Sequence, residues 1–290
     1  MSARVPVIRA LSALRDQVNA WRKAGEGIAL VPTMGALHEG HLQLVRRAKA
    51  RCRRAVVSIF VNPTQFAPHE DFSRYPRDEA GDLAKLASVG CDAVWAPELA
   101  IMYPDGFAIR IVPAGAAEGL ESDFRPHFFA GVATVCAKLF TQVAPDVAVF
   151  GEKDYQQLRV VIQMVRDLDL ALTIVGAPTV REPDGLAMSS RNAYLTADHR
   201  RIAPTLDRVL RQAAEAVSQG GIAAGATAEG RAVLEAAGFR VDYLEVRDAE
   251  TLQAASPGTQ RPLRVLAAAW LGTTRLIDNV GVERGARPGL

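Results

Sequence analysis

The sequence has few cysteines and no long uninterrupted hydrophobic run. Its three cysteines, Cys52, Cys91 and Cys136, lie far apart and form no C-x-x-C pair, which argues against a disulfide framework and a zinc site. No run approaches the roughly 18 apolar residues that a membrane-spanning helix needs. Residues 1–17 lack the apolar stretch and cleavage site of a signal peptide. We therefore expect a cytoplasmic protein that crosses no membrane.

Excess charge of one sign is also missing, because the net charge is only +2 over 290 residues. Proteins that bind duplex nucleic acid usually carry a concentrated basic face. The densest basic cluster, RRAKARCRR at 46–54, could be such a face, but cations also suit the C-terminal end of a helix. We favour the helix end and expect no nucleic-acid partner.

Two common phosphate-binding motifs are absent. The sequence contains no G-x-x-x-x-G-K-[ST], which excludes a P-loop, and no G-x-G-x-x-G follows the first predicted strand. Any nucleotide site must therefore be built from other residues.

What the first 180 residues do contain is an alternation of short apolar runs and longer helical patterns. The apolar runs are 27–33, 55–61, 92–97, 146–151 and 172–179, and helical spacing occurs at 42–52, 78–90, 131–143 and 155–170. Continuous apolar runs are typical of strands buried on both faces of a parallel sheet. The alternation predicts an α/β fold with a Rossmann-like, doubly wound parallel sheet. Ligands of such a sheet bind beyond the carboxyl ends of the strands.

The pattern changes near residue 180. Residues 196–221 are predicted to form one amphipathic helix and residues 227–238 another, while 240–248 and 261–280 resemble strands of a separate small sheet. We therefore predict a large domain over 1–180 and a smaller C-terminal α+β domain over 181–290.

Two histidines lie where the first predicted strand passes into a helix, in LVPTMGALHEGH at 30–41. If the helix begins near Glu39, then His38 and His41 lie in its first turn, where free N–H groups and the helix dipole attract phosphate. The two imidazoles could then donate hydrogen bonds to charge that develops on a phosphoryl group. Alternatively, His38 caps the helix and His41 packs in a polar pocket, and H-x-G-H alone does not decide between these interpretations.

A second candidate is VNPTQF at 61–66, directly after another predicted strand. Gln65 would project at the carboxyl end of the sheet, where its amide can hold a hydroxyl and a carboxylate oxygen of a small substrate. The simpler alternative is a turn without a ligand.

The third candidate is FGEKDYQQL at 150–158, where a strand passes into a helix. The chain has only five lysines against 29 arginines, so Lys153 suggests a site for a compact ammonium on phosphate. Asp154 could cap the helix or hold a ribose or a metal-bound water, and Gln157 would face the cleft. A capped helix with a surface ion pair is the alternative.

The fourth candidate, REPDGLAMSSRN at 181–192, lies at the predicted domain boundary. Ser189, Ser190 and Arg191 could form a mobile phosphate clamp, although three such residues alone are no evidence. Only the combination is informative, because all four segments fall where an α/β sheet places its ligand.

With these segments in hand, the chain resembles the pantothenate synthetase (pantoate–β-alanine ligase) family over nearly its whole length. The matching segments are VPTMGALHEGH, SIFVNPTQF, YPRD at 75–78, GEKDYQQL, GLAMSSRNAYL and AAAWLGTTRLIDN. The resemblance places the chain among nucleotidyltransferases with a HIGH-type and a KMSKS-like motif, represented here by residues 38–41 and 188–191. It implies ATP-dependent ligation of (R)-pantoate and β-alanine through pantoyl adenylate, giving pantothenate, AMP and pyrophosphate. Mg²⁺ is expected mainly on the ATP phosphates, with no metal ligand assigned in the protein.

The resemblance also implies roles for individual residues. His41, His38 and Lys153 would be catalytic, with both histidines acting chiefly on phosphate charge; whether His41 also donates a proton is left open. Gln65 would hold pantoate and later β-alanine, and Gln157 would hold pantoate's other side. Hinge closure would keep water from the acyl adenylate. The ATP site would comprise Met34, Gly35, Ala36, Leu37, His38, Glu39, Gly40, His41, Gly151, Glu152, Lys153, Asp154, Val180, Met188, Ser189, Ser190 and Arg191.

One segment departs from the family pattern. Where the family commonly has Arg-Pro-Gly-His-Phe-Arg-Gly-Val, this chain has RPHFFAGV at 125–132, so Phe128 and Ala130 replace His and Arg. We leave Arg125 and His127 without a role and expect an active enzyme with altered kinetics.

Two alternatives remain. A nucleotidyltransferase for a phosphorylated substrate would need further basic residues, whereas Gln65 and Gln157 are neutral. A non-catalytic nucleotide- or RNA-binding protein would use the 46–54 cluster and lose affinity steeply with salt. The family implies small-molecule substrates and a homodimer, whose interface the sequence does not locate.

Overall fold

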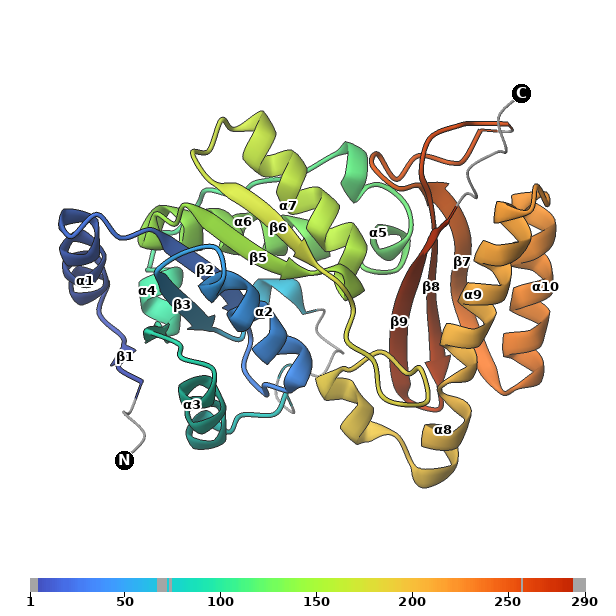
Figure 1. Ribbon diagram of the computed structural model, residues 1–290, viewed down its shortest axis with the longest axis horizontal. Helices are drawn as coiled ribbons and strands as arrows, with labels where there is room; N and C mark the ends of the chain where they lie inside the picture. Colours follow the sequence, from blue (N-terminus) through green and yellow to red (C-terminus); the bar gives the residue numbers. More distant parts are fainter. Residues whose placement is uncertain (1–4, 67–71, 73–74, 257, 284–290) are drawn as a thin grey trace.

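The computed structural model describes residues 5–66, 72, 75–256 and 258–283 (Figure 1). It contains two sheets that lie side by side, a six-stranded one built from the first 177 residues and a three-stranded one near the C-terminus. The outer ends of the two predicted domains, residues 1–4 and 284–290, lie outside the described residues.

The large sheet has the order β1-β4-β3-β2-β5-β6, and all of its strand pairs are parallel. Its strands are β1 Val7–Ile8, β2 Ile28–Thr33, β3 Arg54–Ile59, β4 Ala93–Trp95, β5 Val147–Gly151 and β6 Thr173–Ala177. The predicted α/β fold is confirmed, with each predicted strand present. Strand β1 was not predicted from the sequence, because two residues carry no readable periodicity.

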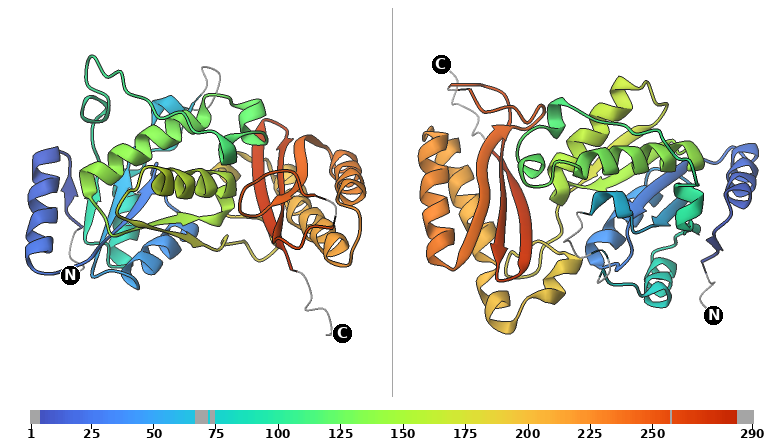
Figure 2. Two further views of the ribbon diagram at one scale, coloured as in Figure 1. Left: turned by 90° about the horizontal axis from the view of Figure 1, so that it is seen from above. Right: turned by 180° about the vertical axis from the view of Figure 1, so that it is seen from behind.

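Helices cover both faces of this sheet (Figure 2). Helices α1 Leu11–Lys23, α6 Phe128–Val143 and α7 Tyr155–Asp167 pack in one core, and α2 Glu39–Lys49 and α3 Glu79–Ser88 pack in another. Successive residues of a strand point to opposite faces, so Leu30 belongs to the first core and Val31 to the second. Two short helices, α4 Leu99–Met102 and α5 Glu121–Phe124, lie in the connections.

The basic cluster at 46–54 begins in the last turn of α2 and ends at the first residue of β3. Arg46 and Lys49 lie in the last turn of the helix, and Lys49 and Arg54 both pair with Asp92. This location is the helix end that the sequence favoured.

The C-terminal sheet is antiparallel, with β8 Leu263–Leu271 between β7 Phe239–Asp248 and β9 Thr274–Val282. Helices α9 Thr205–Ser218 and α10 Ala223–Ala236 pack against it in a core of their own. This sheet and its helices match the predicted α+β composition. Across the described ranges, no helix combines the length and apolar character needed to cross a bilayer.

The prediction of one helix over 196–221 is wrong. The segment forms α8 Ala197–Ile202 and α9, which are separated by Ala203 and Pro204. Proline has no N–H to donate to the carbonyl four residues earlier, so it interrupts the helix but is tolerated where α9 begins. The periodicity continues through the break and therefore conceals it.

Candidate active site

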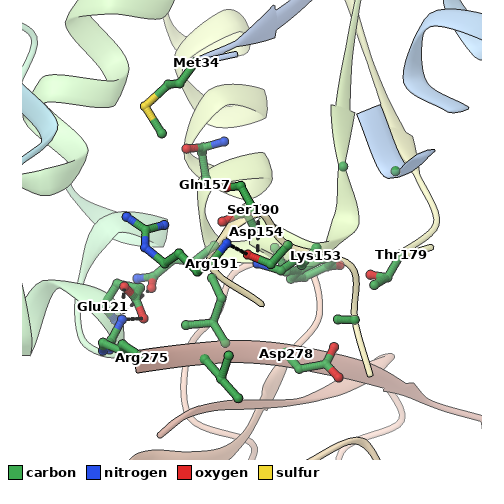
Figure 3. A pocket seen from close by; sticks show the side chains of 18 of the residues that line it. Met34, Glu121, Lys153, Asp154, Gln157, Thr179, Ser190, Arg191, Arg275 and Asp278 are labelled. Carbon is green, nitrogen blue, oxygen red and sulfur yellow. Dashed lines mark hydrogen bonds and ion pairs between the residues drawn. The ribbon is translucent and has the colours of Figure 1, made fainter. Parts of the chain in front are cut away.

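A cavity of about 790 Å³ lies between the carboxyl ends of the large sheet and the C-terminal sheet (Figure 3). Thr33 and Gly151, at the ends of β2 and β5, line one side, and Asp278 of β9 lines the other. Parallel α/β sheets bind their ligands at this edge. The four segments singled out in the sequence all reach the cavity.

The two histidines meet at the N-terminus of α2. Gly40 N–H donates to His38 Nδ1 at 3.2 Å, and His38 N–H donates to His41 Nδ1 at 3.3 Å. Their ring centroids are 4.1 Å apart, and both residues line the cavity. Because both Nδ1 atoms accept, the neutral rings carry their hydrogen on Nε2. The capping interpretation is therefore correct for His38, and it leaves both Nε2–H groups as donors for a ligand.

Both imidazoles are neutral at physiological pH. Burial, reinforced by Lys153, lowers the pKa of His38 to about 4. Burial and the neighbouring His38 lower the pKa of His41 to about 3. A neutral imidazole is a hydrogen-bond donor and a poor proton source. This favours stabilisation of phosphate charge over proton donation.

Part of the predicted nucleotide loop lies behind the cavity wall. Met34 and Gly40 belong to the described lining, whereas Gly35, Ala36, Leu37 and Glu39 do not. The N–H groups of Ala36 and Leu37 donate to Asp82 on α3, and Glu39 pairs with Arg46. The assignment of these four residues to the ATP site stays a prediction, because their position gives it no support.

Gln65 is fixed within a tight turn that follows β3. The 3₁₀ helix Pro63–Gln65 is capped by Asn62, and Asn62 Nδ2 donates to Gln65 Oε1 at 2.8 Å. Gln65 is buried but lines the cavity. The turn is therefore present, and it orients the amide so that Nε2 remains a donor at the cavity. The substrate role of Gln65 stays a prediction.

The segment after β5 brings a lysine and a carboxylate to the cavity. Lys153 Nζ lies 3.9 Å from Asp154 Oδ2, and both residues line the cavity with Gly151 and Gln157 (Figure 3). The capping role considered for Asp154 is wrong, because its side chain makes no cap hydrogen bond at the start of α7. Glu152 is outside the lining and pairs with Arg264 at 3.1 Å.

Residues 181–187 form a small hairpin beside the C-terminal sheet, and the 3₁₀ helix Ser190–Tyr194 follows it. Arg181 and Ala187 pair as an antiparallel bridge across Gly185, and Arg181 Nη1 donates to Asp278 Oδ2 at 2.6 Å. The hairpin thus presents the predicted clamp to the cavity. All five residues predicted here to contact ATP line the cavity: Val180, Met188, Ser189, Ser190 and Arg191.

A buried ion-pair cluster beside the cavity was not anticipated from the sequence. Arg275 Nη1 of β9 donates to Glu121 of α5 at 2.7 and 2.9 Å, and its Nε donates to Asp242 of β7 at 2.8 Å. Tyr243 OH also donates to Glu121, at 2.9 Å. The residues are far apart in the sequence, and the only signal was Arg275 within the matched TTRLIDN segment. The cluster links α5 to the C-terminal sheet on one side of the cavity, where Glu121 and Arg275 lie next to each other (Figure 3).

The divergent segment 125–132 also borders the cavity. The Arg125 guanidinium lies 3.9 Å from the Phe128 ring centroid, and its Nη2 donates to the Gln65 carbonyl at 3.0 Å. His127 is outside the described lining, and its Nε2 is buried without a hydrogen-bond partner. The structure thus places Phe128, and not His127, at the cavity.

The fold and this site define the class of the protein: an α/β enzyme fold with a phosphate-suited cavity at the carboxyl edge of a parallel sheet. Comparison with known families makes this specific. The family described as pantoate-beta-alanine ligase matches residues 6–281. The chain belongs to this family.

Individual relatives agree over their full lengths. The chain is 60% identical to a pantothenate synthetase of Bradyrhizobium sp. strain BTAi1 over 97% of this chain and 100% of that protein. A crystal structure of pantothenate synthetase from Thermus thermophilus superimposes with a TM-score of 0.90 at 46% identity, over 96% of this chain and 99% of the other. A pantoate-beta-alanine ligase from Francisella tularensis, complexed with beta-gamma ATP and beta-alanine, gives 0.81 at 34%, over 97% and 99%.

Proposed function

We propose that the chain joins (R)-pantoate and β-alanine at the expense of ATP, releasing AMP and pyrophosphate. The observation that carries this proposal is the convergence of His38, His41, Lys153 and the 188–191 clamp on one cavity. The neutral side chains of Gln65 and Gln157 line the same cavity. The family match over 6–281 supports the same reaction, as does the ligand set of the Francisella relative.

The reaction has two steps. The carboxylate of pantoate attacks the α-phosphorus of ATP, forming a P–O bond as the bond to pyrophosphate breaks, which gives pantoyl adenylate. The amine of β-alanine then attacks the activated carbonyl, forms the amide and displaces AMP, and the amine loses a proton to solvent. Both steps run in one cavity between the sheets, where water can be kept from the acyl adenylate.

We assign the phosphate charge to the neutral histidines and to Lys153. Donors already in place, in a partly dry site, stabilise charge that grows on the leaving pyrophosphate without having to reorient. Gln65 and Gln157 would hold pantoate, and Gln65 also β-alanine, because an amide binds hydroxyl and carboxylate groups. The Ser189–Arg191 segment would close over the triphosphate.

Mg²⁺ is proposed to arrive on ATP. Among the described residues, no group of three or more His, Cys, Asp or Glu side chains could hold a metal ion by itself. We propose that phosphate oxygens hold the ion, and that the half-exposed Asp154 carboxylate is available to a metal-bound water or to the ribose. When bound, the ion would neutralise part of the triphosphate charge.

The domain boundary near residue 180 also remains a proposal. Arg181 pairs with Asp207 at 2.9 Å as well as with Asp278, so the hairpin that carries the clamp is anchored to the C-terminal elements. The connection from β6 at 178–180 is then the natural hinge. Closure over that hinge would carry residues 188–191 onto ATP.

We further propose a homodimer that works in the cytoplasm. Ile109 and Val112 are 76% and 78% exposed in the segment after α4, and a second copy of the chain would cover such apolar side chains. Sedimentation equilibrium should give twice the mass of one chain. In the double variant Ile109→Asp, Val112→Asp, the measured mass should fall toward that of one chain. A wild-type monomer at micromolar concentration would reject the dimer.

The function is tested by product formation with purified protein. ATP, Mg²⁺, D-pantoate and β-alanine should give pantothenate and AMP in equal amounts, and omission of pantoate or β-alanine should abolish pantothenate. A cytidylyl- or adenylyltransferase would instead turn over with a phosphorylated acceptor. Folded protein that binds ATP but makes no pantothenate would reject the proposal.

A further inference from the structure

The turn that leads into α2 has an unfavourable backbone conformation. Gly35 has φ of 83° and Ala36 has φ of 51°, and the second value lies in the left-handed region that alanine rarely adopts. Such a conformation persists only where the surroundings impose it. The turn immediately precedes His38, so its shape sets where that residue lies.

Two side chains of α3 impose the conformation. Asp82 Oδ2 accepts from Ala36 N–H at 2.9 Å, and Asp82 Oδ1 accepts from Leu37 N–H at 2.8 Å. One turn later, Lys85 Nζ donates to the Leu37 carbonyl at 2.7 Å. Asp82 is only 1% exposed, so both of its oxygens are committed to this turn away from solvent.

The hydrogen bonds continue from this turn to the histidines. The peptide between Leu37 and His38 is held at its carbonyl by Lys85 and at its N–H by Nδ1 of His41. A shift of this peptide would therefore move the His41 ring as well as His38. Displacements near 1 Å are enough to affect phosphate chemistry strongly.

Packing alone does not account for these side chains. The neighbouring Leu86 is fully buried and already anchors α3 in the core, whereas burial of a carboxylate is costly. Burial raises the pKa of Asp82, against the effect of its two N–H donors. An apolar residue would pack at lower cost, so the carboxylate has a purpose in the turn.

We propose that Asp82 and Lys85 are positioning residues that hold the 35–38 turn so that the imidazoles of His38 and His41 meet the ATP phosphates. Neither side chain is among the described residues that line the cavity. The inference rests on the proposed function, which places phosphate at these histidines.

The test compares Asp82→Asn with Asp78→Asn. Asparagine at 82 keeps one acceptor but sets an NH₂ group against the second N–H, which loosens the turn with almost no change in volume. Asp78 caps the same helix through Gly81 N–H at 3.0 Å and does not contact the turn, and asparagine caps helices equally well. Affinities for MgATP and for D-pantoate are measured separately by calorimetry, together with amide hydrogen exchange at residues 36 and 37.

We expect Asp82→Asn to weaken MgATP binding and slow adenylate formation by about ten- to hundredfold. Pantoate affinity should not change, since Gln65 and Gln157 are on other elements, and the amides of Ala36 and Leu37 should lose protection. Lys85→Met should act in the same direction, while Asp78→Asn should match wild type throughout.

Wild-type ATP affinity in folded Asp82→Asn would overturn the proposal. So would equal weakening of ATP and pantoate, because that is the mark of a general structural role. The two ideas can fail separately. If wild type makes no pantothenate but Asp82→Asn selectively loses ATP affinity, the proposed function fails and the positioning role stands. If wild type is active and Asp82→Asn binds ATP as wild type does, only the positioning role fails.

Discussion

Replacing Arg275 by methionine should destabilise the protein strongly. The guanidinium is 13% exposed and bridges Glu121 and Asp242, whose side chains are 7% and 3% exposed. Removal of one partner from a buried ion pair typically costs about 3–5 kcal/mol, because the remaining charge is buried and uncompensated. Here Glu121 retains Tyr243 OH and the more distant Arg125 at 3.7 Å, and Asp242 retains Trp270 Nε1 and Arg240 at 3.3 Å. We therefore expect the lower end of that range, a loss of about 3 kcal/mol.

The assay is urea unfolding followed by tryptophan fluorescence, with Arg166→Met as the control. Arg166 pairs with Asp167 on the surface, where its side chain is 74% exposed, so its loss should leave the free energy of unfolding close to that of wild type. Adding Glu121→Gln to Arg275→Met should restore part of the loss, since position 121 then carries no buried charge that lacks its closest cation. If Arg275→Met is no less stable than Arg166→Met, the cluster does not stabilise the contact between α5 and the C-terminal sheet.

The site yields three further predictions. The pKa of His41 is lowered to about 3 in the folded protein, so as the pH falls below about 6.5 the unfolded chain binds a proton at His41 before the folded chain does. The contribution of His41 to the free energy of unfolding is therefore fully present above about pH 6.5. About 2 kcal/mol of it should be lost by pH 4.5, after allowance for partial exposure of the side chain. Urea unfolding above pH 6.5 and at pH 4.5 should show a smaller loss of unfolding free energy in His41→Gln than in wild type. Phe128→Leu removes the ring that lies 3.9 Å from the Arg125 guanidinium, and Arg125 donates to the Gln65 carbonyl. The change should therefore disturb Gln65 and raise KM for pantoate several-fold, with ATP affinity unchanged. An effect on ATP alone would contradict this link between Phe128 and Gln65. Lys153→Met should lower kcat about a hundredfold or more in steady-state assays, and near-normal turnover would remove Lys153 from the phosphates.

Much of the fold was predictable because buried parallel strands leave continuous apolar runs. Runs such as 55–61 and 146–151 became β3 and β5 within one or two residues. The two-residue β1 and the break at Pro204 were not predictable in the same way. The first is too short to show a period, and the second is masked by periodicity that continues on both sides.

The site was predictable where chemistry is local in the sequence. His38 and His41 are three residues apart, and Lys153 follows directly from a strand, so each carries its own signal. Asp82 carries none, and Arg275 has only its place in the matched TTRLIDN segment, because their partners are 45 and 154 residues away. Folding alone brings such pairs together. The same limit applies to Ala36 and Leu37, whose N–H groups turn away from the cavity for a reason visible only in α3.

The central claim is that pantoate is adenylated before β-alanine takes part. The most direct test is exchange of labelled pyrophosphate into ATP by the purified protein with Mg²⁺. We predict exchange that requires D-pantoate, proceeds without β-alanine and weakens sharply in His41→Gln. Pantothenate formation without any such exchange, or exchange that appears only when β-alanine is added, would contradict an adenylate formed at this site.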